Sequence, residues 1–369
     1  MKKILALITS PLHLIEMVNL MMYDFNGAIC DVAVDDCLLN VISLVENIKK
    51  ISLFNNAFVI SSNSENKETG RYGKYIAKFL RNVHFSKKSI QKKLKRKYRD
   101  LHFDYDTICF YDNWYLNNLI ALSQNHLDNI IWLDDGFASY AGVAFFNKNN
   151  FWDKVRSLFK VNFLRDNITK QYLFYPELKC DGKYNFKCKK LRSLNAHNQE
   201  LRQLLNTIFG INKLYDIKQR YVYLDEPYDE AGGKISNIEI LDLVNPYIRK
   251  ENILIKMHYR NESSEYSKDY QVLNVKGIPW EVIYMNLVAL NQKVILIGLY
   301  STALATPFLI FGDKTPVLIL LNFINENIFN ERISKPLQFT KKIFNSFPDV
   351  FFQPRNNEEL QLILKTLNQ

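Results

Sequence analysis

Short apolar runs alternate along the first half of the chain with segments that have the apolar spacing of helices. The apolar runs cover residues 3–9, 28–35, 57–62, 106–112, 129–135 and, further on, 171–178. Their length and their β-branched content are typical of buried strands. Ser10 and Pro11 end the first run and predict a helix that has Ser10 as its N-cap. This alternation predicts a parallel sheet flanked by helices.

The same alternation starts again in the second half of the chain. Strands are predicted at 220–227, 252–258, 293–302 and 315–323, and helices at 235–248, 279–290 and 357–367. A Lys-rich polar region and a helix at 195–209 separate the two halves. The predicted fold class is therefore α/β, with two Rossmann-like domains that face each other across a cleft. We place the N-terminal domain at 1–195 and the C-terminal domain at 196–369, with the last helix as a candidate to pack back on the N-terminal domain.

Composition and charge narrow the classes of protein. Of the 369 residues, 47% are hydrophobic and 23% are charged, which excludes wholesale disorder. The net charge is +10, and residues 86–99 hold eight Lys or Arg and no acid, so the rest of the chain carries 10 − 8 = +2. This local patch would attract an anionic membrane surface or glycolipid, unless it is only a solvated helix face. Fingers and RNP aromatics are missing from the sequence, so no nucleic-acid partner is predicted.

Cysteine usage and the N-terminus bear on the compartment. The five cysteines are an odd number without CxxC spacing, which argues against a disulfide framework and against structural zinc and fits a reducing cytoplasm. The apolar start of the chain imitates a signal peptide but stops at Ser10-Pro11, and no run approaches the ~18 apolar residues of a membrane span. We expect a cytoplasmic protein, with the inner face of the plasma membrane as a candidate surface.

Candidate chemistry lies where predicted strands end, because ligands of such folds bind at the carboxyl ends of parallel strands. Asp134, Asp135 and Gly136 follow the strand at 129–135. Neighbouring carboxylates repel each other, so one of them can have a raised pKa and act as a general base. The alternative interpretation is an ordinary Asp-Gly turn. Asp229, beyond the strand at 220–227, is a rival base.

Two further constellations have the chemistry of phosphate ligands. Lys256, His258 and Arg260 follow one buried strand and could bind a phosphate by charge and hydrogen bonds, although a lone His is more often structural. Gly298 and the run Tyr300-Ser301-Thr302 follow another strand. Their hydroxyls and backbone N–H groups could bind a phosphate at a helix start, or only cap that helix.

Metal binding is not predicted. Asp104 and Asp106 form a DxD pattern, but they precede their strand and therefore face the wrong end of the sheet, so we interpret them as a solvated turn. Neither a Walker lysine motif nor a GxGxxG pattern is present, which argues against P-loop NTPases and ordinary dehydrogenases. Catalysis would then need neither a metal ion nor a cofactor.

At these residues the chain resembles the bacterial sialyltransferases of glycosyltransferase family 52, the lipooligosaccharide and capsule enzymes of the two-domain GT-B type. The matching motifs, in the family's order, are Ser10-Pro11 at the first helix, Asp134-Asp135-Gly136, Lys256-Met257-His258, Pro279-Trp280-Glu281 at a helix start, and Tyr300-Ser301-Thr302. The chain departs from the family at Tyr259, where the motif has a Pro that shapes the turn presenting the histidine.

The resemblance implies inverting transfer of sialic acid from CMP-sialic acid to a galactose-type hydroxyl of a bacterial surface glycan, with a lipid-linked glycan as a candidate acceptor. Asp135, with Asp134 beside it, would be the catalytic base, and His258 would face the departing phosphate. The remaining donor-binding residues would be Lys256, Arg260, Ser301, Thr302, Tyr300, Gly298, Ser10 and Glu281. Three alternatives stay open: a GT-B transferase for another nucleotide sugar such as a UDP-hexose, a non-catalytic glycan- or nucleotide-binding protein, and a membrane-surface scaffold. A homodimer also stays open.

Overall fold

The computed structural model divides the chain into two compact units. It describes residues 1–62, 86–112, 114–141, 163–179, 186–213, 217–227, 235–258, 261, 266, 268–273, 275–324 and 331–368. Unit 1 comprises Met1–Asp135, Gly142–Arg192 and Thr207–Gly210, and unit 2 comprises Gly136–Ala141, Ser193–Asn206 and Ile211–Gln369. Asp135 and Gly136 are therefore neighbours in the chain that belong to different units.

Unit 1 is built on a seven-stranded sheet with the order β3-β2-β1-β4-β5-β6-β7, in which every neighbouring pair is parallel. The strands are β1 (Lys3–Ile8), β2 (Ile29–Asp35), β3 (Asn56–Ile60), β4 (Thr107–Phe110), β5 (Asn129–Trp132), β6 (Lys170–Leu173) and β7 (Lys187–Lys190). After β3 the chain returns to the other side of β1, so the strand order reverses between β1 and β4. Such a switch point leaves a crevice at the carboxyl ends of the two strands.

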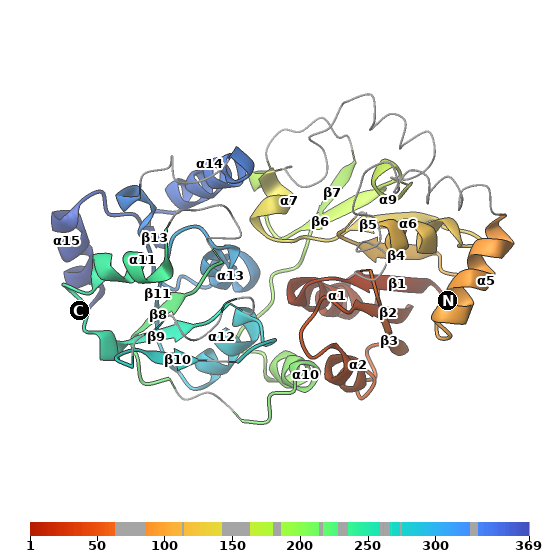
Figure 1. Ribbon diagram of the computed structural model, residues 1–369, viewed down its shortest axis with the longest axis horizontal. Helices are drawn as coiled ribbons and strands as arrows, with labels where there is room; N and C mark the ends of the chain where they lie inside the picture. The colour runs from red at the N-terminus through yellow and green to blue at the C-terminus, as the bar shows by residue number, and fades with distance from the viewer. Residues whose placement is uncertain are drawn as a thin grey trace. The chain divides into compact units, whose positions relative to one another are not determined.

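The helices of unit 1 cover this sheet. They are α1 (Pro11–Tyr23), α2 (Val41–Ile48), α5 (Lys87–Lys97), α6 (Tyr115–Leu122) and α9 (Phe163–Asp166), with the 3₁₀ turn η2 (Pro176–Leu178). Figure 1 shows α2 beside β3, with which it shares many contacts. The prediction for α1 is confirmed, because Ser10 is its N-cap and Pro11 is its first residue. Its residues from His13 to Met21 are all buried, so α1 is a central helix of the unit.

Unit 2 has a six-stranded sheet with the order β10-β9-β8-β11-β12-β13, again parallel throughout. The strands are β8 (Tyr221–Leu224), β9 (Ile253–Lys256), β10 (Gln271–Leu273), β11 (Ile295–Gly298), β12 (Val317–Ile319) and β13 (Phe351–Phe352). The order runs outward from β8 to β10 and then restarts at β11, on the other side of β8. The switch point of unit 2 therefore lies between β8 and β11.

The helices of unit 2 pack on this sheet and on one another. They are α7 (Phe137–Ala141), α10 (Gln199–Phe209), α11 (Asn237–Val244), α12 (Trp280–Ala289), α13 (Thr302–Phe311), α14 (Glu331–Ser346) and α15 (Asn357–Leu367), with the 3₁₀ turns η3 (Lys250–Asn252) and η5 (Leu321–Phe323). The end of α10, from Thr207, belongs to unit 1. α13 contacts β11 and α12 (Figure 1). The last helix begins and ends where the sequence predicts, and its buried Leu360 and Leu364 lie in the core of unit 2.

Among the described elements, three strands and three helices were not predicted. Strand β7 has the sequence KCKK and lies at the edge of its sheet with only partial burial, so it has no apolar run to reveal it. Strands β10 and β13 are only three and two residues long. The missed helices are α7, α9 and α14. A helix expected at 73–84 lies outside the described residues.

The basic stretch 86–99 forms helix α5, and its apolar side is anchored in unit 1. Leu94 is buried in the core, while Lys87 and Lys95 donate hydrogen bonds to the carbonyl oxygens of Asn125 and Leu101. Lys92 and Lys93 are exposed. In the part of the chain that the structure describes, no helix has the length and apolarity needed to cross a membrane.

Candidate active site

Polar side chains gather at the carboxyl ends of three neighbouring strands of unit 1. Thr9 follows β1, Asp112 follows β4, and Asp134 and Asp135 follow β5. Because these strands are adjacent and parallel, their ends meet at one edge of the sheet. The Thr9 hydroxyl donates a hydrogen bond of 2.6 Å to Oδ2 of Asp112, which joins the two strands at the switch point. The edge that the fold favours for a ligand is thus lined by carboxylates.

Glu16 of α1 is the most deeply buried of these acids. Its Oε2 accepts a hydrogen bond of 2.9 Å from the backbone N–H of Asp134, and among the described residues its Oε1 has no hydrogen-bond partner. Burial and the nearby charges of Asp134 and Asp135 raise the pKa of Glu16 well above its usual value, against the opposing effect of that hydrogen bond. Glu16 therefore holds a proton more readily than an exposed glutamate does.

His13, one turn earlier on α1, faces Asp135. Its Nε2 lies 3.2 Å from Oδ1 of Asp135, and the imidazole is buried whereas the Asp135 side chain is 33% exposed. On the other side of the ring, Nδ1 accepts hydrogen bonds from the backbone N–H groups of Ser10, at 3.2 Å, and Thr9, at 3.4 Å. His13 thus completes a capping box with Ser10, whose hydroxyl accepts from the His13 N–H.

The electrostatics of this edge favour protonated acids. Burial raises the pKa of Asp112 to about 6, and the hydrogen bond from Thr9 opposes the shift. Burial also raises the pKa of the Tyr111 phenol, with further contributions from the charges of Asp135, Asp112 and Asp134 and from a hydrogen bond to Asp135. A cluster of carboxylates of this kind stabilises an added proton, which is what a general base needs.

In unit 2 a hydrogen bond also links the two strands at the switch point. Glu226, which follows β8, is buried, and its Oε1 accepts a bond of 2.9 Å from the backbone N–H of Ser301. Ser301 follows β11 and is the N-cap of α13. A carboxylate is favourable there because the first N–H groups of a helix have no intrahelical acceptor. Charge from Glu226 and burial raise the pKa of the neighbouring Tyr300.

Asp225 fixes the segment that carries His258. Its Oδ2 accepts a hydrogen bond of 3.1 Å from the His258 backbone N–H. Its Oδ1 accepts bonds of 2.8 Å from Asn261 and from the Tyr266 hydroxyl. Burial nevertheless raises the pKa of Asp225, and these three hydrogen bonds oppose the shift. The turn after β9 is therefore held by a carboxylate at the end of β8.

Lys256 is a half-buried cation beside buried acids. Burial lowers its pKa to about 8, and the charges of Glu281 and Asp225 only partly oppose this. Its Nζ donates a hydrogen bond of 2.9 Å to the Met257 carbonyl oxygen. Glu281, in the first turn of α12, has its own pKa raised by burial. Lys256 thus changes its charge close to neutral pH, which suits a group that binds a phosphate.

Close packing explains two of the glycines near these strand ends. Gly136 has φ +71°, and a Cβ there would overlap the side chain of Thr302, whose Oγ1 accepts a hydrogen bond of 3.1 Å from the Phe137 N–H. Gly298, at the end of β11, lets the Leu304 side chain of α13 approach closely. The Thr302 hydroxyl is therefore engaged within unit 2, and Gly298 has a packing role.

The predicted site residues fall into three groups. Asp134 and Asp135 lie together in unit 1 with Ser10, which caps α1. The predicted unit 2 residues lie at the carboxyl ends of its strands or at adjoining helix starts, and are Lys256, His258, Glu281, Gly298, Tyr300, Ser301 and Thr302. Arg260, Asp229 and the departure at Tyr259 lie outside the described residues.

Sequence reasoning missed three acids or bases in unit 1 and underrated two in unit 2. His13 occupies the third helical position after Ser10, where a capping box usually has Glu or Gln, so the motif was visible only in a variant form. Glu16 is a lone acid in the otherwise apolar sequence of α1, and Asp112 ends a predicted strand. Asp225 and Glu226 also end a predicted strand, but only the tertiary structure shows their partners.

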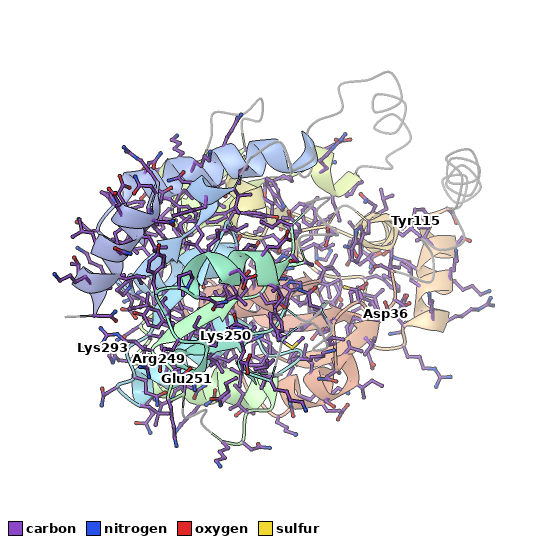
Figure 2. The ribbon with its side chains drawn as sticks, turned by 60° about the vertical axis from the view of Figure 1, so that its left-hand side comes forward. Asp36, Tyr115, Arg249, Lys250, Glu251 and Lys293 are labelled. Atoms are coloured by element: carbon purple, nitrogen blue, oxygen red, sulfur yellow. The ribbon has the colours of Figure 1, made fainter. Side chains whose placement is uncertain are left out.

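The amino ends of the strands have a different character. Asp104 forms an ion pair with Lys3, and Asp106 lies 2.9 Å from His126. Both acids of the DxD pattern therefore have basic partners at the amino end of β4. In unit 2, Arg249, Glu251 and Lys293 are exposed near the amino ends of β9 and β11 (labelled in Figure 2). Within the described ranges no group of three or more His, Cys, Asp or Glu residues could hold a metal ion.

Comparisons with known proteins show the fold. No family model matches the chain, and no curated protein matches it. A crystal structure of an α/β-galactoside α-2,3-sialyltransferase from Photobacterium phosphoreum matches over 96% of this chain and 98% of its own, with a TM-score of 0.50 and 10% identity. UGT89C1 of Arabidopsis thaliana, complexed with UDP-L-rhamnose, matches over 100% and 89%, also with a TM-score of 0.50 and 10% identity. The chain has the GT-B fold.

We predict that Glu16→Gln stabilises the protein increasingly as the pH rises. A carboxyl whose pKa is raised on folding stabilises the native state at low pH and loses this contribution once the pH exceeds its unfolded value of 4.5. The amide keeps an oxygen that can accept the Asp134 N–H. Urea unfolding at pH 5, 7 and 9 should show a gap over wild type that widens with pH. Glu46→Gln, on the exposed surface of α2, is the matched control. Parallel plots of stability against pH for Glu16→Gln and wild type would contradict a raised pKa of Glu16.

We predict that Lys256→Met raises stability at neutral pH. The folded pKa of about 8 lies below the usual 10.5, so burying the charged amine costs most below pH 8 and nothing above 10.5. The gain at pH 7 should be roughly 3 kcal/mol and should shrink between pH 8 and 10.5. Lys293→Met, at an exposed lysine, should show no such pH dependence. A gain that is the same at all pH values would mean that Lys256 is not desolvated.

Proposed function

We propose that this chain is an inverting glycosyltransferase that uses a nucleotide-sugar donor, and that it transfers sialic acid from CMP-sialic acid to a galactose-type hydroxyl of a surface glycan. The observation that carries the proposal is the setting of Asp135. Its carboxylate lies at the carboxyl end of β5, beside the switch point of a GT-B sheet, and faces His13 and Tyr111. A carboxylate held in this way at a ligand-binding edge has the properties of a general base.

Asp135 differs from the neighbouring acids in its exposure to solvent. Asp134 and Glu16 are buried, with exposed fractions of 2% and 0%, whereas the Asp135 side chain is 33% exposed. A base must touch the hydroxyl whose proton it takes, so the buried acids are unsuitable for this role. Asp134 and Glu16 instead lie beside Asp135 as buried acids. Asp134 is therefore a supporting residue in the proposed mechanism.

The proposed reaction is a single displacement. The acceptor oxygen forms a bond to the anomeric carbon of the donor while the bond from that carbon to the phosphate oxygen of CMP breaks. The proton of the acceptor hydroxyl passes to Asp135, and the electron pair of the broken bond leaves with the phosphate. Cations and hydrogen-bond donors stabilise the charge that develops on this leaving group. Neither a covalent enzyme intermediate nor a metal ion takes part.

Unit 2 supplies the groups proposed for the donor. Lys256 is the last residue of β9, and His258 follows this strand. Ser301 is the N-cap of α13. The Ser301 N–H is bonded to the Glu226 carboxylate, so a donor phosphate that binds this N–H takes the place of Glu226. Arg260 and Tyr300 complete the proposed donor set, with N-terminal residues 1–195 on the acceptor side and 196–369 on the donor side. Asp229 remains the rival base.

The identity of the donor rests on the ordered motifs and on one structural likeness. The matched Photobacterium enzyme is a sialyltransferase, although one of glycosyltransferase family 80 and not 52. The matched Arabidopsis protein carries UDP-L-rhamnose with the same TM-score, which keeps a UDP-sugar as the second candidate donor. Asp134-Asp135-Gly136, Lys256-Met257-His258 and Tyr300-Ser301-Thr302 favour CMP-sialic acid through their resemblance to sialyltransferase motifs.

A lipid-linked acceptor fits helix α5. Its anchored apolar side leaves Lys88, Lys92, Lys93 and Arg96 exposed, and each cation near an anionic membrane contributes about 1 kcal/mol of attraction. This surface would bring the protein to the membrane face where a lipid-linked glycan is built. Such attraction falls with salt, because exposed charges are screened beyond ~10 Å at 0.1 M.

We predict that Asp135→Asn lowers kcat by about 10²–10⁴-fold with little change in melting temperature, because the amide cannot take the acceptor proton. Steady-state transfer from CMP-sialic acid to a galactoside measures the loss. Asp36→Asn is the matched control, since Asp36 follows strand β2 of the same sheet (labelled in Figure 2) and accepts a hydrogen bond from the Ser61 hydroxyl. Wild-type turnover in Asp135→Asn would assign the base to another residue, with Asp229→Asn as the next variant.

We predict that CMP raises the melting temperature more than UDP or GDP does. A nucleotide present at 100 times its Kd stabilises the native state by about 2.7 kcal/mol. His258→Ala should weaken CMP binding more than ~10-fold, because a hydrogen bond to a charged group contributes roughly 1.5–3 kcal/mol. A shift with UDP and none with CMP would favour the UDP-sugar transferase instead.

A further inference from the structure

His13 is a buried imidazole whose place in the capping box does not explain its contact with Asp135. It lies in the first turn of α1 and is fully buried, and its ring is 5.1 Å from the ring of Tyr111. A neutral imidazole has one N–H donor and one acceptor nitrogen, and which nitrogen carries the proton is set by the partners of the other. The partners of His13 therefore reveal what it presents to Asp135.

The backbone decides the protonation of Nδ1. Two backbone N–H groups, of Ser10 at 3.2 Å and Thr9 at 3.4 Å, direct their hydrogens at this nitrogen. The Thr9 hydroxyl is also 3.2 Å away, but its own hydrogen goes to the Asp112 carboxylate. A proton on Nδ1 would break both backbone bonds and face two N–H groups. Nδ1 is therefore an acceptor, and the proton of the ring lies on Nε2.

The remaining face of the ring is directed at the carboxylate. Nε2 lies 3.2 Å from Oδ1 of Asp135, within ion-pair distance but without the geometry of a hydrogen bond, and among the described residues Nε2 has no hydrogen-bond partner. The other ionisable groups around the pair are Tyr111, Asp112, Asp134 and Glu16. Tyr111 donates a hydrogen bond to Asp135 and the other three groups are acids, so the imidazole joins Tyr111 as a group that can steady the negative charge of Asp135.

We infer that His13 is the positioning residue of Asp135: the cap of α1 locks the imidazole with its N–H on Nε2, and that N–H orients the Asp135 carboxylate toward the acceptor hydroxyl. The role rests on the proposed function, in which Asp135 is the base. His13 itself is not the base, because its acceptor nitrogen is buried against the backbone of Ser10 and Thr9. The cap of α1 and the proposed catalytic carboxylate are thus connected through the His13 imidazole.

Two substitutions separate positioning from folding. His13→Gln keeps an oxygen for the Ser10 N–H and an N–H for Asp135, whereas His13→Glu keeps only the oxygen and adds a like charge. Both residues suit this position of a capping box, so α1 should form in each variant. We expect His13→Gln to stay within about 10-fold of wild-type kcat and His13→Glu to lose ~100-fold, a loss typical of outer-shell partners, with KM for the donor unchanged.

The pH profile gives a second readout. A carboxylate at position 13 should raise the pKa of Asp135 by repulsion and shift the acidic limb of kcat/KM to higher pH, while His13→Gln should leave that limb in place. Equal losses in both variants without a shift would overturn the inference and leave His13 a structural residue. A larger loss in His13→Gln than in Asp135→Asn would also overturn it, because His13 would then be the base.

A third readout does not depend on activity. In protein labelled with ¹⁵N-histidine, the ring nitrogens of His13, assigned by their loss in His13→Gln, should show Nδ1 without a proton and Nε2 with one. Asp135→Asn should move the Nε2 resonance. The opposite tautomer, or an unmoved resonance, would overturn the inference. If the tautomer and the shift are found but wild-type protein neither transfers nor hydrolyses any nucleotide sugar, the proposed function fails and the His13–Asp135 pairing stands.

Discussion

The first two turns of α1 hold the chain beyond β5, and the candidate site of unit 1 depends on this contact. Glu16 accepts the Asp134 N–H at 2.9 Å, and His13 brings Nε2 within 3.2 Å of Asp135. The two side chains are three residues apart on one helix, so they lie on the same face and act together. Because Ser10 caps the first turn and α1 is buried along its length, the face cannot rotate away. A strand end that would otherwise be an Asp-Gly turn becomes a fixed pair of carboxylates.

Each unit has its own polar link, and the two links occupy the same topological position in their sheets. In unit 1 the Thr9 hydroxyl, after β1, donates to Asp112, after β4. In unit 2 Glu226, after β8, accepts from the Ser301 N–H, after β11. In both sheets the chain leaves these two strands in opposite directions, which opens a crevice that no strand fills. Polar groups are tolerated there because they bind one another across the crevice, and the same groups can bind a ligand.

Burial raises the pKa of an acid in unit 1 and lowers the pKa of a base in unit 2, so both pKa values move toward neutral pH. It raises the pKa of Asp112 to about 6 and lowers that of Lys256 to about 8, since desolvation disfavours whichever form is charged. These shifts work against folding, so the surrounding core must supply the stability. Groups that change their charge near neutral pH at a ligand-binding edge are typical of sites that move protons or bind phosphate.

The sequence by itself determined the alternation of strands and helices, the cap at Ser10, the last helix and the strand ends that carry Asp135 and Lys256, because these follow from local periodicity and turn chemistry. It could not reveal β7, whose KCKK sequence forms a strand only through its pairing with β6. Nor could it reveal that His13 faces Asp135, 122 positions along the chain, since β4 and β5 reach the side of β1 only in the folded sheet. Only the tertiary structure decided which buried groups are partners, because their pKa values and orientations arise from neighbours brought together by packing rather than from local sequence.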